Sequence, residues 1–106
     1  MKKIAFILLV LLMPGLLFAA AMTQPSVTTI YHYYEEHSGL LIAQANMIDP
    51  DNCGRNDLYI LWQGHPHYKE ITAMILAAHF AKKPIHFYIS GCIEGLPAIK
   101  HAYSYQ

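Results

Sequence analysis

The apolar and polar positions from residue 27 onward fall into short runs that predict strands. Residues 27–34 (VTTIYHYY) and 40–48 (LLIAQANMI) are rich in β-branched, aromatic or other apolar residues, and they flank the turn-forming sequence EEHSG. This pattern predicts two strands that pair as a hairpin. Residues 49–57 (DPDNCGRND) have the composition of a loop, and residues 58–62 (LYILW) predict a third short strand.

The period of the pattern changes after Pro66, where a helix is expected. Proline fits the first helical turn, and the 17 residues HYKEITAMILAAHFAKK that follow contain no helix breaker and end in lysines, which a helix C-terminus favours. We expect a helix from Pro66 to Lys82. Strands are predicted at residues 85–90 and 98–105, with a turn at Leu96–Pro97 between them.

The predicted fold class is mainly β with one helix, in the order β-β-β-α-β-β. Five short strands with one helix between the third and the fourth match the element order of an OB-like barrel, in which the helix covers one end of a small closed sheet. An open α+β sheet with the helix on one face is the alternative.

The N-terminal residues have the features of a cleaved signal peptide. Lys2 and Lys3 precede an apolar run that ends at Phe18, and small alanines at positions 19 to 21 provide a cleavage site. A membrane anchor fits less well, because the run is short and is interrupted by Pro14–Gly15. We therefore expect residues 1–21 to be removed, and residues 22–106 to form a single secreted or periplasmic OB-like domain with no membrane attachment.

Export determines the expected state of the two cysteines, Cys53 and Cys92. Thiols in an oxidising compartment are normally paired, and two cysteines allow a single intrachain disulfide. The chain has no CxxC pair, so the spacing supports neither a zinc ribbon nor a thioredoxin-like site.

The charge of the predicted mature chain argues against nucleic acid as a partner. Residues 22–106 contain five lysines and arginines against seven acidic residues, a balance of −2 with histidines neutral. The chain therefore lacks the basic surface that nucleic acids or anionic membranes require.

The second half of the chain resembles a known family. The stretch from LYILW to KHAYSY has a cysteine before the third strand, a Tyr-Lys helix start, an Ala-Ala helix centre, a Lys-Lys-Pro helix exit and a strand closing in Ser-Gly-Cys. In these features it resembles small secreted bacterial proteins with the toxin B-subunit fold, the pertussis-like and subtilase-cytotoxin-like B subunits. The resemblance implies an OB-fold, a homopentameric ring, binding of cell-surface sialoglycans and an enzymatic toxin subunit as partner. No sugar-contacting residue is carried over.

Candidate catalytic and metal-ligating residues are few. His65 and His67 form an HxH pair with Glu70 three residues further on, which makes them the best candidates for zinc or copper ligands. A helix start with partly exposed histidines explains them better. Ser90 lies outside any G-x-S-x-G elbow and has no adjacent acid. The chain is therefore expected to be a non-enzyme without a cofactor.

Aromatic residues give a candidate ligand-binding surface. Tyr31, Tyr33 and Tyr34 lie in one predicted strand with His32, and alternation places Tyr31 and Tyr33 on one face and the other two rings on the opposite face. Tyrosine rings with polar tips suit sugar stacking or a protein interface. Good strand propensity alone also accounts for the tyrosines.

The predicted helix has two apolar sides. One side is expected to cover the core and consists of Ile71, Met74, Ile75, Ala78 and Ala81. The other side carries Ala73, Leu76 and Phe80, an ordered apolar stripe that predicts contact with another copy of the chain. A homo-oligomer is therefore expected, a pentamer before a dimer.

These observations predict a secreted, non-enzymatic binding module for a cell-surface glycan or protein receptor. The alternative is a periplasmic or secreted structural or inhibitory domain that binds another protein.

Overall fold

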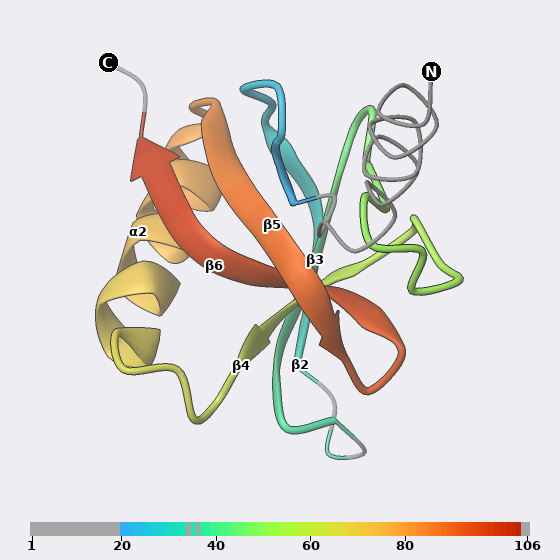
Figure 1. Ribbon diagram of the computed structural model, residues 1–106. Helices are drawn as coiled ribbons and strands as arrows, with labels where there is room; N and C mark the ends of the chain where they lie inside the picture. Colours follow the sequence, from blue (N-terminus) through green and yellow to red (C-terminus); the bar gives the residue numbers. More distant parts are fainter. Residues whose placement is uncertain (1–19, 34, 36, 105–106) are drawn as a thin grey trace, which may run out of the picture.

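One six-stranded sheet and one helix form the part of the chain that the computed structural model describes, which is residues 20–33, 35 and 37–104 (Figure 1). The elements along the chain are β1 (Ala21–Met22), β2 (Thr28–Tyr33), β3 (Gly39–Gln44), β4 (Tyr59–Trp62), α2 (Tyr68–Ala81), β5 (Ile85–Ile93) and β6 (Leu96–Ser104). From β2 onward the order is the predicted β-β-β-α-β-β, and the fold is mainly β with one helix.

The strands lie in the sheet order β1-β5-β6-β4-β3-β2. Strands β2, β3 and β4 form an antiparallel meander, and α2 carries the chain from β4 to the β5–β6 hairpin. Strand β6 then pairs in parallel with β4, through Ile60 and Ala98. Figure 1 shows β5 and β6 as a long, curved hairpin with α2 beside the C-terminal half of β6.

The predicted closed barrel is not confirmed, because the sheet is open with β1 and β2 at its two edges. The open α+β sheet, given above as the alternative, fits the structure. The edge of β5 is occupied by the N-terminal segment: Met22 pairs with Tyr88, and Ser26 forms an isolated bridge with Ile85. Strand β2 therefore pairs with β3 and not with β5.

The turn between the last two strands differs from the prediction. Leu96 and Pro97, predicted as a turn, are buried residues at the start of β6. The turn lies at Glu94 and Gly95, which have φ angles of 53° and 77°. Positive φ at both central positions suits the right-handed twist of a tight hairpin. The second predicted strand is also shorter than expected and ends at Gln44.

Helix α2 begins two residues later and ends one residue earlier than the predicted 66–82. It ends because Lys82 adopts a left-handed conformation with φ 53°, and the N–H groups of Lys82 and Lys83 donate to the carbonyls of His79 and Ala78. The buried helix residues are Ile71, Ile75 and Ala78, with Met74 packed partly against the core. Ala81, predicted on the core side, is exposed and is the last residue of the helix.

Two clusters of buried side chains lie on the two faces of the sheet. The larger cluster packs under α2 and contains Leu40, Ile42, Tyr59, Leu61, Ile71, Ile75, Ala78, Ile85, Phe87, Ile89 and Ile99. The smaller one contains Leu41, Ile60, Leu96 and Ala98. Strand β3 contributes alternate residues to both clusters, so all six of its residues are buried.

The predicted disulfide between Cys53 and Cys92 is confirmed. It joins the 45–58 loop to β5, with the two Cα atoms 5.6 Å apart. The loop is also held by hydrogen bonds: the Asp49 carboxylate accepts the N–H groups of Cys53 and Gly54 at 2.7 and 3.0 Å, and the Asp51 carboxylate accepts a backbone N–H of β5 at 2.8 Å. The aspartates of this loop therefore serve its local structure.

The predicted signal peptide at residues 1–21 lies outside the described residues, apart from positions 20 and 21. Within the described ranges, no helix has both the length and the apolar character needed to cross a membrane.

Candidate binding face

A short motif, His-x-Tyr, occurs once in each of the two longest strands. It comprises His86 and Tyr88 in β5, and His101 and Tyr103 in β6. The antiparallel register places His86 opposite Tyr103 and Tyr88 opposite His101. Directly opposite residues of paired strands point to the same side, so each histidine is beside a tyrosine of the other strand.

The four rings lie on the outer side of the hairpin. The residues that alternate with them in β5 (Ile85, Phe87 and Ile89) are fully buried in the core. The rings of His86 and Tyr103 stack with centroids 4.9 Å apart and planes 10° from parallel, and those of Tyr88 and His101 lie 5.6 Å apart at 30°. We call these four residues the His–Tyr face.

Two neighbouring features extend this face. Met22 of β1 pairs with Tyr88 and is 46% exposed, so it adds a flexible apolar side chain beside the rings. The second feature is a shallow hollow of about 300 Å³ between β6 and the residues before α2. Its lining consists of His65, His67, Ile71, Lys100, His101, Ala102 and Tyr103.

The hollow contains the two histidines predicted as weak metal candidates. His65 Nδ1 accepts the backbone N–H of His67 at 2.9 Å, which leaves Nε2 as the protonated nitrogen that donates to the carbonyl of Lys100 at 2.8 Å. Both ring nitrogens of His65 are therefore engaged in fixing the loop to β6. No group of three or more potential metal ligands occurs among the residues that the structure describes.

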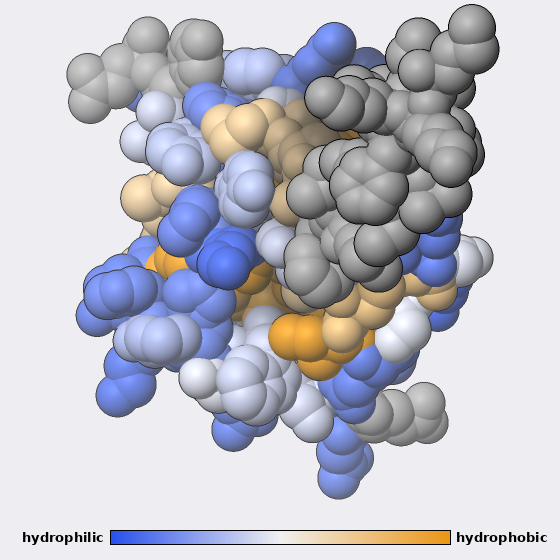
Figure 2. Space-filling model, viewed as in Figure 1, coloured by the Kyte–Doolittle hydropathy of each residue, from blue (hydrophilic) through white to orange (hydrophobic). Residues whose placement is uncertain are grey.

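The electrostatics of the hollow favour neutral or acidic ligands. Lys100 is exposed, and the described lining residues include no carboxylate. A bound anionic group at this position would meet a cation and the ring edges of His101 and Tyr103. On the side of the molecule seen in Figure 2, strongly hydrophobic residues form only small, separate areas among hydrophilic ones, so that side offers no large apolar patch.

The predicted tyrosine site at the N-terminal strand is not brought into this face. Tyr33 is 59% exposed on β2, which lies three strands away from β6 in the sheet order. Tyr31 is in β2 opposite Ile42, and Tyr34 lies outside the described residues. The His-x-Tyr spacing of the two final strands is the sequence signal for the observed face, but residues 32–34 have the same spacing, so the signal alone does not locate the face.

The predicted oligomer stripe lies on the outer side of α2. Phe80 is 76% exposed, Ala73 is exposed and Leu76 is half-buried. The stripe is thus available for contact with another molecule, and the interface itself stays a prediction.

The clearest shifted pKa in the interior belongs to Tyr59. Burial raises the pKa of its phenol above the usual value, and the hydrogen bond from the Ile48 N–H, 2.8 Å from the hydroxyl, lowers it by a smaller amount. The ring packs edge-on against Phe87 with centroids 6.3 Å apart. Tyr59 is therefore a core residue whose hydroxyl anchors a loop, and not part of an open site.

The chain matches no known protein family, no curated protein and no solved structure at a significant level.

Proposed function

We propose that this protein is a secreted, non-enzymatic binding module that recognises a glycan through the His–Tyr face. The observation that carries the proposal is the two ring pairs on the outer side of the hairpin: His86 stacks on Tyr103, and Tyr88 lies beside His101 with the ring planes tilted by 30°. The apolar C–H face of a sugar packs on such rings, while phenol and imidazole groups hydrogen-bond its hydroxyls. Rings that are already ordered by strand pairing lose little conformational entropy when the ligand binds.

An acidic sugar suits the surroundings of this face best. Lys100 lies in the hollow next to His101 and Tyr103, without a carboxylate among the described lining residues. A charge-assisted contact from Lys100 to a sugar carboxylate would add to ring stacking and would select acidic glycans. This agrees with the sialoglycan ligand that the resemblance to toxin B subunits implies.

The wider proposal is a B-subunit-like protein with an OB-type strand arrangement. Its support is the strand sequence β2-β3-β4-β6-β5 with a parallel β4–β6 pair, and the bridge between Ser26 and Ile85 next to β2. The disulfide supports an exported chain, since such bonds persist in oxidising compartments. An enzymatic toxin subunit is the partner that this proposal expects.

We also propose that the chain forms a homo-oligomer through the outer stripe of α2. Ala73, Leu76 and Phe80 present apolar surface on a helix whose opposite side already packs on the core. Burial of Phe80 in particular would remove a large exposed ring from water. A closed ring would cover this surface in every copy.

The glycan proposal is tested on the purified, disulfide-bonded chain with a glycan array, followed by titration of the strongest hit. Tyr103→Ala should weaken binding about tenfold or more, as expected for a central contact residue. Tyr33→Ala is the matched control, because it removes another exposed tyrosine from a different strand and should leave affinity unchanged.

Two results would count against the glycan proposal. One is an array without any hit from folded protein, which would favour the alternative of a protein-interaction domain. The other is a glycan hit whose affinity falls with Tyr33→Ala and not with Tyr103→Ala, which would place the site on β2.

A further inference from the structure

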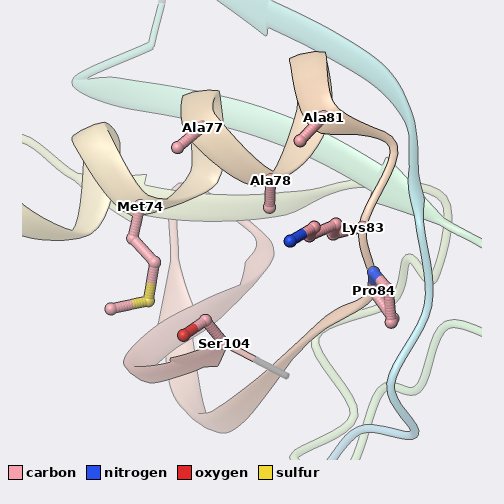
Figure 3. A pocket seen from close by; sticks show the side chains of 7 residues that line it. All are labelled: Met74, Ala77, Ala78, Ala81, Lys83, Pro84 and Ser104. Atoms are coloured by element: carbon pink, nitrogen blue, oxygen red, sulfur yellow. The ribbon is translucent and has the colours of Figure 1, made fainter. Parts of the chain in front are cut away.

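A second concave site lies between the C-terminal half of α2 and the end of β6. It is a groove of about 320 Å³ lined by Met74, Ala77, Ala78, Ala81, Lys83, Pro84 and Ser104 (Figure 3). None of the residues of the His–Tyr face lines it. The groove is therefore independent of the glycan proposal.

The lining combines aliphatic walls with two polar groups. In Figure 3 the side chains of Met74 and Ala78 point from the helix into the groove, and the Lys83 ammonium extends into the space below Ala78. Ser104 contributes a hydroxyl from the strand opposite the helix. The groove thus offers a cation at Lys83 and a hydroxyl at Ser104, and otherwise methyl, methylene and thioether groups.

No described residue compensates the charge of this groove. Among the described residues, no carboxylate lies within ion-pair distance of Lys83, and no acidic residue lines the groove. The last carbonyls of the helix are occupied by the N–H groups of Lys82 and Lys83, which reduces their repulsion of an anion. An anionic ligand therefore complements the site.

We propose that this groove binds an aliphatic monocarboxylate, with the carboxylate at Lys83 and the alkyl chain along Met74, Ala77 and Ala81. The lining contains no aromatic ring that would stack on a planar ligand. Methionine adapts its shape to a flexible chain, and the small alanine side chains leave room for one. A second copy of this protein is a poorer occupant, because an apolar interface would cover the unpaired ammonium of Lys83 at a desolvation cost.

The test is an NMR titration of the ¹⁵N-labelled, disulfide-bonded chain with sodium butanoate, hexanoate and octanoate. Amide shifts should concentrate at the groove residues and saturate. The dissociation constant should fall about twofold for each added methylene, since a fully buried methylene gives about fourfold and this groove is open on one side. Octan-1-ol, with the same alkyl chain and no charge, should bind more weakly than octanoate.

Two pairs of variants separate the groove from general surface effects. Lys83→Gln should weaken octanoate about two- to fivefold, the range expected for a solvent-accessible ion pair, and Lys82→Gln should not, since Lys82 is the same residue type outside the groove. Ala77→Leu fills the groove and should abolish the saturable shifts. Lys69→Leu, at an exposed residue of the same helix that lines neither the groove nor the outer stripe, should leave them intact.

The proposal is overturned if octanol binds as tightly as octanoate, or if the two variants of a pair lose affinity equally. It is also overturned if intermolecular NMR contacts show that a second copy covers Met74 and Ala77 in the oligomer. A failed glycan array leaves these outcomes unaffected, because no residue of the His–Tyr face takes part.

Discussion

Replacing Tyr59 by phenylalanine removes one hydroxyl from the core and keeps the aromatic ring. The ring is fully buried and packs edge-on against Phe87, a contact that phenylalanine retains. The hydroxyl accepts the backbone N–H of Ile48 at 2.8 Å. The substitution therefore isolates one hydrogen bond between the core and the 45–58 loop.

The expected loss of stability near neutral pH comes from the donor left behind. The Ile48 N–H is partly buried and would have no acceptor in its present position, which costs about 1–2 kcal/mol. For a domain of this size, each kcal/mol lowers the melting temperature by about 4–8 °C. Tyr59→Phe should therefore melt at least about 4 °C below the parent protein.

The same substitution should remove part of the instability at alkaline pH. Because burial raises the pKa of Tyr59, the native state holds the phenol proton more tightly than the unfolded state, whose pKa is about 10. The stabilisation is complete below pH 10 and is lost as the pH rises through the pKa of the folded state, by at most about 1.4 kcal/mol per pH unit. Phenylalanine has no such proton, so the variant should lose stability less steeply above pH 10.

Urea unfolding from pH 7 to pH 11, followed by tyrosine absorbance and circular dichroism, measures both effects. Tyr103→Phe is the matched control, because Tyr103 is 41% exposed and its substitution leaves the core unchanged. An unfolding free energy for Tyr59→Phe within about 0.3 kcal/mol of the parent at pH 7, or an unchanged slope above pH 10, would refute the assigned role of the hydroxyl.

Three further predictions concern the disulfide, the helix and a strand contact. Cys53→Ser with Cys92→Ser should lower the unfolding free energy by about 4 kcal/mol, because the disulfide closes a loop of 39 residues. Urea titration measures this loss, and a loss below about 1 kcal/mol would contradict a stabilising role of the disulfide. Leu76→Glu with Phe80→Glu should convert the proposed oligomer to monomer in light scattering, and an unchanged mass would exclude this stripe as the interface. Gly39→Ala should destabilise by about 2 kcal/mol or more in thermal melts, because an added Cβ meets a backbone carbonyl of β4, and a parent-like melt would contradict that close approach.

Most elements were predictable because their residues carry a strong local pattern. Helix α2 follows from an apolar 3.6-residue period without breakers, and its observed end at Ala81 is one residue short of the predicted limit. Strand β1 was not predictable, since two residues have no periodicity and Ala21–Met22 pair only because β5 offers them an edge. The turn was wrongly predicted at Leu96–Pro97 because proline is common in turns. The turn of the hairpin is formed by Glu94 and Gly95, which have positive φ angles.

The candidate site was only partly visible in the sequence, because facing rings depend on register. The number of aromatic residues in one predicted strand favoured Tyr33 and its neighbours as a site. The number of rings in a strand does not determine which rings face each other across a sheet. The His-x-Tyr spacing was visible in residues 86–88 and 101–103. Only the register of the hairpin, which pairs His86 with Tyr103 and Tyr88 with His101, turns two short motifs into one face.

The His–Tyr face lies on the β5–β6 hairpin because strands β3 and β4 of the same sheet are largely buried. Strand β3 is buried on both faces, and β4 is buried along most of its length, so neither strand presents an open row of rings. The β5–β6 hairpin has its core side filled, whereas His86 and Tyr88 on its outer side are partly exposed. Strand β5 is also held at several points: Thr23 Oγ1 accepts the N–H of Phe87, Gln44 donates to the carbonyl of Ile85, and the disulfide fixes Cys92.

Contacts of this kind at both ends of a strand limit its motion, so the rings on its outer side keep the spacing that a rigid ligand requires. The turn of the hairpin is tied down as well, because the carboxylate of Glu94 accepts the N–H of Ser38 at 2.7 Å. The restraints from the N-terminal segment, the 45–58 loop and the β2–β3 turn therefore act together to preorganise the proposed glycan site.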